Sequence, residues 1–128
     1  MAGKIRLTLR IELGDGARLG HGKVLLMERI AEMGSIAAAA RSMDMSYRRA
    51  WLLINELNGS FRRPVVSART GGSKGGAAEV TEFGMALAVC YRRMESQALR
   101  VLAKDLAEIE TDLVTPARAA RGARQRLS

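Results

Sequence analysis

The sequence predicts a mainly α-helical fold with a small antiparallel β-sheet. Three observations support this prediction. Residues 34–58 have the pattern of two short helices joined by a tight turn, residues 65–81 that of two strands joined by a glycine-rich loop, and residues 82–113 carry apolar side chains at steps of three and four. In this order, the elements predict a winged helix-turn-helix followed by a long C-terminal dimerisation helix.

Composition and charge indicate one small domain with a polyanionic partner. Aromatic residues make up only 4% of the 128 residues, so the core must be largely aliphatic, which favours helix. The net charge of +8 is distributed as +6 over residues 1–81, −2 over 82–113 and +4 over 114–128. We therefore expect a basic winged helix-turn-helix domain (1–81), a dimerisation helix (82–113) and a basic disordered tail (114–128).

The helix-turn-helix has suitable capping residues at its corners. Gly34 suits the left-handed end of one helix, and Ser35 can cap the next. Asp44 tolerates the left-handed conformation that a turn at residues 43–45 needs. Ser46 is a second N-cap candidate, so we expect the second helix to start directly after it.

The second helix of the motif has an apolar and a polar face. Its regular structure is expected to end at residues 58–60. The apolar stripe consists of Tyr47, Ala50, Ile54 and Leu57. The opposite face carries Arg48, Arg49, Leu52 and Asn55. Arginine can bind guanine or phosphate and asparagine can pair with adenine, so this face predicts a recognition helix in a DNA major groove. The alternative is an amphipathic helix whose solvated face happens to hold two arginines. Trp51 is assigned to packing.

The N-terminal segment predicts a strand and a helix. Residues 4–13 alternate apolar and polar side chains, as in a half-buried strand. A glycine-rich turn follows, and residues 23–33 have the first helical pattern. Nucleotide binding at this turn is not expected, because the glycine spacing differs from that of a dinucleotide-binding loop and the chain leaves no room for a doubly wound parallel sheet.

A wing is predicted from two strands, residues 65–69 and 77–81, and the glycine-rich loop 70–76 between them. The glycines would let backbone N–H groups approach DNA phosphates, while Arg69 and Lys74 would supply charge. A phosphate-binding loop of an NTPase is not expected, because a strand and not a helix follows Lys74. A polar hairpin without a ligand is the alternative.

The last helix, residues 82–113, can be capped by Thr81 and would be roughly 45–50 Å long. A domain of about eighty residues cannot cover such a rod, so we expect its partner to be the same helix of a second chain. A two-fold dimer of this kind can span two half-sites on DNA. The side chains expected at the dimer contact are Leu87, Met94, Leu99, Leu102, Leu106 and Ile109.

Catalytic and metal sites are not expected. His21 is the only histidine and has no second ligand near it, and Cys90 is the only cysteine and fits an apolar helical pattern as a small buried side chain. A single cysteine indicates a reducing compartment. The N-terminus lacks a signal-peptide pattern and no apolar run reaches the ~20 residues of a membrane span, so we expect a cytoplasmic protein without a membrane partner.

Three segments resemble the DNA-binding domain of the ModE-type molybdate-responsive transcriptional regulators, which is related more distantly to the LysR-type winged helix. The segments are IRLTLRIEL, GSIAAAARSMDMSYRRAWLLINELN and ARTGGSKGGAAEVTEFG, within about residues 4–100. The resemblance implies a homodimer that binds double-stranded DNA. It implies that residues 46–49 lie at the groove and residues 70–76 in the wing.

The end of the chain differs from that family. ModE-type regulators continue into C-terminal oxyanion-binding β-domains, whereas this sequence ends at Ser128 in an arginine-rich tail. We therefore expect no cofactor and no molybdate binding by this chain, and we interpret it as a naturally short regulator. The alternatives are a truncated chain and a DNA-binding half that works with a separate sensor.

The predicted function is that of a sequence-specific DNA-binding transcriptional regulator of molybdenum-related or metabolic genes, acting as a homodimer and not as an enzyme. The alternative is a non-specific DNA-binding structural protein, or a partner-dependent one whose ligand sensing resides in another chain. The residues expected to contact DNA are Ser35, Ser46, Tyr47, Arg48, Arg49, Leu52, Asn55, Arg69, Thr70, Gly72, Ser73 and Lys74.

Overall fold

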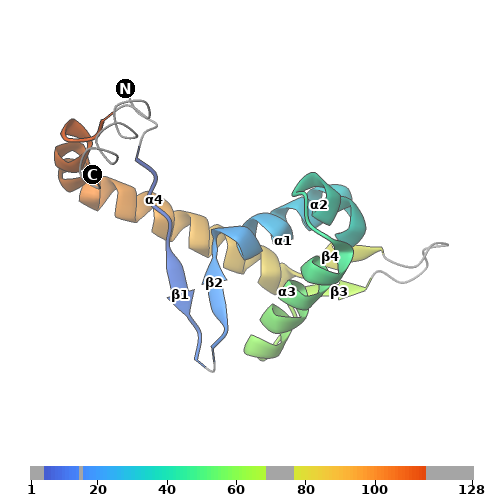
Figure 1. Ribbon diagram of the computed structural model, residues 1–128. Helices are drawn as coiled ribbons and strands as arrows, with labels where there is room; N and C mark the ends of the chain where they lie inside the picture. The colour runs from blue at the N-terminus through green and yellow to red at the C-terminus, as the bar shows by residue number, and fades with distance from the viewer. Residues whose placement is uncertain (1–4, 15, 69–76, 115–128) are drawn as a thin grey trace. The chain divides into compact units, whose positions relative to one another are not determined.

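The computed structural model describes residues 5–14, 16–68 and 77–114. In chain order its elements are β1 (Arg10–Glu12), β2 (Arg18–Gly20), α1 (His21–Met33), α2 (Ile36–Ser42), α3 (Tyr47–Ser60), β3 (Val66–Ala68), β4 (Ala78–Val80) and α4 (Glu82–Thr111) (Figure 1). This order confirms the predicted fold class, a winged helix-turn-helix with a long last helix. The chain divides into two compact units, of which Thr8–Ser96 holds the whole helix-turn-helix.

Strands β1 and β2 form an antiparallel hairpin in which Ile11 lies opposite Leu19. Side chains alternate between exposed and half-buried over residues 5–13, as predicted, but the strand itself covers only three residues and not 4–13. A ladder extends only as far as its partner, and β2 has three residues. The glycine-rich sequence around β2 predicts only a turn, so this strand was not predicted, and α1 begins two residues before its predicted start.

The two corners of the helix-turn-helix confirm the predicted capping. Gly34 ends α1 with φ of 72°, and Ser35 Oγ accepts the N–H of Ala38 at 3.1 Å. In the next turn, Asp44 has φ of 53°. Ser46 Oγ then accepts the N–H of Arg49 at 3.1 Å, which caps α3. These short-range bonds set where each helix begins.

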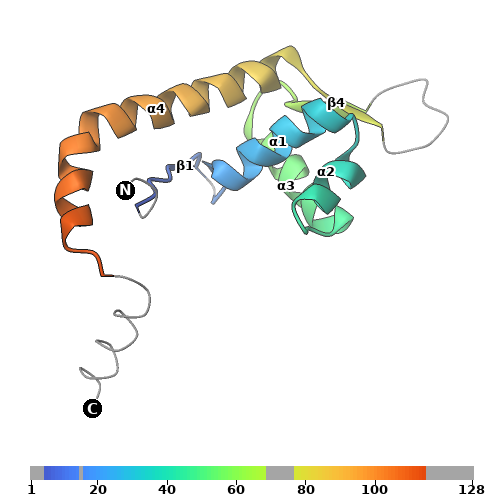
Figure 2. The same cartoon turned by 90° about the horizontal axis from the view of Figure 1, so that it is seen from above.

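The core lies among α1, α2, α3, the wing strands and the first half of α4. In Figure 2, α1 lies between the first half of α4 and the α2–α3 pair. The buried side chains are Leu19, Val24, Leu26, Met27, Ile30, Ala39, Ala40, Ala50, Ile54, Leu57, Val65, Val66, Ala78, Ala88 and Tyr91. Alanines on three helices leave little side-chain volume between the axes, which lets the helices approach closely.

The wing strands β3 and β4 pair antiparallel, with Ser67 opposite Glu79, and are shorter than predicted. An isolated bridge joins Ala77 to Ser35, and the N–H of Ala78 donates to the carbonyl of Gly34 at 3.0 Å. The α1–α2 corner therefore holds the base of the wing. The predicted loop, residues 70–76, lies outside the described residues.

Asn58 joins α3 to the wing. Its Oδ1 accepts the N–H groups of Val65 (2.7 Å) and Val66 (3.3 Å), and its Nδ2 donates to the carbonyl of Val66 at 3.0 Å. Helix α3 ends at Ser60, within residues 58–60, where the sequence predicts the end of regular structure. Asn58 stays helical because its side chain bonds to the neighbouring segment and does not compete for its own backbone.

Helix α4 begins as predicted, with Thr81 Oγ1 accepting the N–H of Gly84 at 2.9 Å. Its buried face consists of Gly84, Ala88 and Tyr91. Tyr91 was not predicted in the core; its hydroxyl donates to the carbonyl of Leu9 at 2.7 Å. Cys90, expected to be buried, is half-buried, because the small residues at 84 and 88 bring a neighbouring stripe of α4 against the core.

An ion-pair cluster also joins α4 to α1. The Arg92 guanidinium lies 2.7 Å from a carboxylate oxygen of Glu28, 2.9 Å from one of Glu95 and 3.0 Å from Nδ1 of His21. The hydrogen bond to Glu28 raises the pKa of Arg92 further above its already high value. His21 therefore belongs to a structural cluster around an arginine.

Candidate nucleic-acid interface

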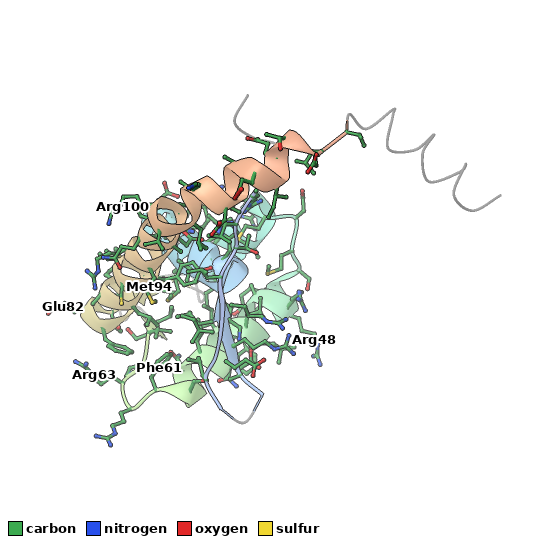
Figure 3. All side chains as sticks on the ribbon, turned by 90° about the vertical axis from the view of Figure 1, so that its left-hand side faces the viewer. Arg48, Phe61, Arg63, Glu82, Met94 and Arg100 are labelled. Carbon is green, nitrogen blue, oxygen red and sulfur yellow. The ribbon has the colours of Figure 1, made fainter. Side chains whose placement is uncertain are left out.

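The exposed face of α3 carries all the helix residues that the sequence assigns to DNA contact. Ala50, Ile54 and Leu57 are buried on the other face, which fixes the rotation of the helix about its axis. The exposed residues of α3 are Tyr47, Arg48, Arg49, Trp51, Leu52, Asn55, Glu56 and Gly59. Figure 3 shows Arg48 projecting on the opposite side of the domain from Arg63 and Glu82.

Ser46 and Ser35 each accept a hydrogen bond from a backbone N–H group, and the hydroxyl proton of each remains available to donate to another partner. Each side-chain oxygen accepts a backbone N–H at its helix N-terminus, and Ser46 is exposed while Ser35 is half-buried beside the wing. A serine hydroxyl that accepts one bond can also donate one. Together with the free N–H groups of the first turn of α3, Ser46 can therefore hold an anionic oxygen.

Trp51 corrects the sequence analysis, which assigned it to packing. Its side chain is 46% exposed, and Tyr47, on the predicted apolar stripe, is 49% exposed. Both line a groove of about 280 Å³ between α3 and the wing, together with Asn55, Ser67, Ala68 and Ala77. Tyr47, Trp51 and Asn55 recur at steps of four, and this spacing is the sequence signal for a shared face beside the wing.

The predicted wing contacts Arg69, Thr70, Gly72, Ser73 and Lys74 lie outside the described residues. The strands that flank them are described, and the groove beside Trp51 is bounded by β3 and β4.

The six predicted dimer residues all lie on α4. Leu87 and Met94 are half-buried against their own core, whereas Leu99 and Ile109 are 46% and 58% exposed, and Leu102 and Leu106 are intermediate.

The described part of the chain contains no group of three potential metal ligands among its His, Cys, Asp and Glu residues. None of its helices combines the length and the apolar character of a membrane span. The exposed face of α3 carries guanidinium, amide, hydroxyl and aromatic groups. These groups bind anions, base edges and planar rings.

Comparison with known proteins points to one family. The chain is 37% identical over 112 residues to the molybdenum-pterin-binding protein MopA of Rhodobacter capsulatus, a match that covers 88% of this chain and 41% of the relative. It is 33% identical over 111 residues to the DNA-binding transcriptional dual regulator ModE of Escherichia coli K12 (82% and 40%) and over 107 residues to the molybdenum transport protein ModE of Azotobacter vinelandii (81% and 39%).

This chain is a homologue of the ModE proteins. A match over 88% of its length necessarily includes the helix-turn-helix and the wing. The chain spans about two fifths of the length of these ModE relatives, for example 41% of MopA. No protein-family model matches the chain.

Proposed function

We propose that this chain is a DNA-binding transcriptional regulator that reads base pairs with the exposed face of α3. The observation that carries the proposal is the arrangement of Arg48, Leu52 and Asn55 on a capped helix whose other face is buried. Arginine can donate two bonds to guanine, asparagine can pair with adenine, and leucine offers an apolar contact to the thymine methyl. The name of the relative from Escherichia coli, a DNA-binding transcriptional regulator, supports this reading.

Contacts to the sugar-phosphate backbone of the DNA would set the register of α3 on the duplex. We assign this part to Ser46 at the helix N-terminus, to Ser35 beside the wing and to the wing residues Arg69 and Lys74. Tyr47 and Trp51 would pack against sugar and base edges from the groove beside the wing. The contacts to phosphate and sugar carry no sequence information directly but hold the arginines of α3 in place.

The regulator is proposed to act as a homodimer through α4. Its support is the apolar stripe that includes Leu99, Leu102, Leu106 and Ile109, of which Leu99 and Ile109 are among the exposed apolar side chains. A second copy of the helix would bury them. Two recognition helices related by a two-fold axis would then read a symmetric pair of half-sites.

The remaining assignments are also proposals. Molybdenum-related genes are the proposed targets because two relatives are named for molybdenum and its transport. We propose no cofactor and no molybdate site in the residues of this chain, no catalytic activity, and a cytoplasmic location, which a lone cysteine favours.

The proposal is tested by comparing two recognition-helix variants with a matched surface variant. Arg48→Ala and Asn55→Ala should lose about 1–3 kcal/mol of binding free energy on a selected duplex and much less on random DNA. Arg93→Ala, which removes an exposed arginine of α4, serves as the control. Fluorescence anisotropy on both duplexes gives the comparison. Equal losses on both duplexes would contradict base reading by α3.

A second candidate function is non-specific DNA coating, which the four arginines of residues 115–128 favour. These residues lie outside the described part of the chain. Deleting them should remove most of the affinity if the coating function holds, and should leave the ratio of specific to random binding unchanged if α3 reads the bases.

A further inference from the structure

The β1–β2 hairpin presents charged side chains on one face and apolar ones on the other. Arg10 lies opposite Gly20 and Glu12 opposite Arg18, so Arg10, Glu12 and Arg18 share a face, and all three are exposed. The other face carries Leu19, which is 2% exposed in the core, and Ile11, which packs against that core. The apolar face therefore fixes the hairpin to the domain, and the charged face is left to solvent.

This charged face borders α3 on the side away from the wing. Figure 1 shows the hairpin beside α3. A groove of about 250 Å³ between them is lined by Arg10, Arg18, Lys23, Met45, Arg49 and Leu53. The wing groove, in contrast, is lined on α3 by Tyr47, Trp51 and Asn55. The recognition helix thus has a hairpin on each of its two long sides.

Lys23 fixes the position of the hairpin relative to α3. Its ammonium group donates to the carbonyl of Arg18 at 2.6 Å and forms an ion pair with Glu56 of α3. The lysine side chain is 11% exposed and the Glu56 side chain 45%, so the lysine is largely buried while water reaches the ion pair from the Glu56 side. The contact neutralises the one acidic side chain of α3 and leaves the nearby arginines free for another partner.

Three arginines that converge on this groove have no ion-pair partner among the residues that the structure describes. They are Arg10 and Arg18 of the hairpin and Arg49 of the recognition helix. Glu12, the residue opposite Arg18, is the remaining acid on the hairpin face. The groove therefore has a net positive charge, and its donors are guanidinium groups, which match phosphate oxygens in geometry as well as in charge.

We propose that the β1–β2 hairpin is a second DNA-backbone clamp, in which Arg10 and Arg18 hold phosphates next to the major groove that α3 enters. The proposal rests on DNA binding by α3 and adds a contact on the side opposite the wing. Arg49, at the border of the groove, would join these phosphate contacts. Such contacts position the protein and contribute affinity without reading sequence.

The test compares Arg10→Gln, Arg18→Gln and Glu12→Gln with Arg93→Gln, an exposed arginine of α4 outside this groove. Binding is measured by anisotropy on a selected and a scrambled duplex across a range of salt concentrations. We expect Arg10→Gln and Arg18→Gln each to weaken binding about three- to tenfold on both duplexes and to reduce the slope of log affinity against log salt by about 0.9. Glu12→Gln should strengthen binding, because it removes a negative charge beside Arg18.

Thermal melting of each variant separates a binding effect from loss of the fold, and these side chains are exposed, so melting should not change. The clamp is overturned if Arg10→Gln and Arg18→Gln bind like Arg93→Gln while Arg48→Ala still loses specific binding. It is also overturned if the losses appear on the selected duplex alone with an unchanged salt slope, since that result would mean base reading. Failure of the unaltered chain to bind either duplex would instead overturn the proposed function.

Discussion

Gly84 shows how a single residue sets the approach of α4 to the wing. A Cβ at this position would lie 2.3 Å from the carbonyl oxygen of Val65 and 2.7 Å from a methyl group of Val80. We predict that Gly84→Ala lowers the free energy of unfolding by about 2–3 kcal/mol, because backbone must shift to admit the methyl group. Urea unfolding followed by circular dichroism measures the change.

Gly59 provides the matched control. It lies in α3 and a Cβ there would meet no atom within 4 Å, so Gly59→Ala should stabilise by about 0.5–1 kcal/mol. Equal effects of the two substitutions would contradict the close packing assigned to Gly84.

The free energy of unfolding should fall at alkaline pH because Tyr91 is buried. Burial, and then the nearby Glu95 carboxylate, raise the pKa of the Tyr91 phenol above its ordinary value of 10.0. The folded state therefore keeps the proton longer than the unfolded state. Stability from this group is complete below about pH 10 and falls as the pH rises from there through the folded pKa.

Tyr91→Phe should cost about 1 kcal/mol at neutral pH, because the carbonyl of Leu9 loses its donor. Above pH 10 the difference between the variant and the unaltered chain should shrink, since phenylalanine does not titrate. Urea unfolding between pH 7 and 11 tests this, with Tyr47→Phe, an exposed tyrosine, as the control. A difference that stays constant with pH would rule out the assigned burial of the phenol.

Among the elements, the contact between α3 and the wing depends on one side chain. We predict that Asn58→Ala lowers the unfolding free energy by about 2 kcal/mol, because the N–H of Val65 loses its only partner on α3. Asn58→Asp should cost less, since it keeps both accepted bonds, although it replaces the donation to the carbonyl of Val66 with repulsion between two oxygen atoms. Denaturant unfolding ranks the two variants. The reverse order would show that the amide donor is the more important half of the contact.

The corners of the helix-turn-helix could be predicted because their signals are local. Gly34, Ser35, Asp44 and Ser46 each act on backbone within four residues, so their residue types alone mark the corners. The exposure of Arg48, Arg49, Leu52 and Asn55 on α3 could be predicted in the same way, from helical periodicity.

The remaining features depend on long-range packing. β2 exists only because β1 lies beside it, and three residues are too few for a strand pattern of their own. Trp51 is exposed because the wing leaves a groove there, and Tyr91 is buried because Gly84 and Ala88 bring that stripe of α4 to the core. An isolated sequence pattern contains none of these partners.

For the whole molecule, the proposed dimer predicts a specific response to charge on α4. Leu102→Glu and Ile109→Glu should each shift the chain toward the monomer, because a carboxylate would be buried between two helices. Ala107→Glu, at an exposed position away from that stripe, should leave the mass unchanged. Sedimentation equilibrium measures the oligomeric state. A monomer in the unaltered chain, or equal effects of all three variants, would contradict the proposed contact.

The central proposal is that this chain reads DNA sequence as a two-fold dimer. Selection of binding sites from a random duplex pool, at about 0.15 M salt to weaken purely electrostatic binding, tests that claim most directly. The account predicts enrichment of a two-fold symmetric motif whose half-sites are about one helical turn, or a multiple of it, apart. A pool that binds without enrichment of any motif would contradict it and would favour the DNA-coating function.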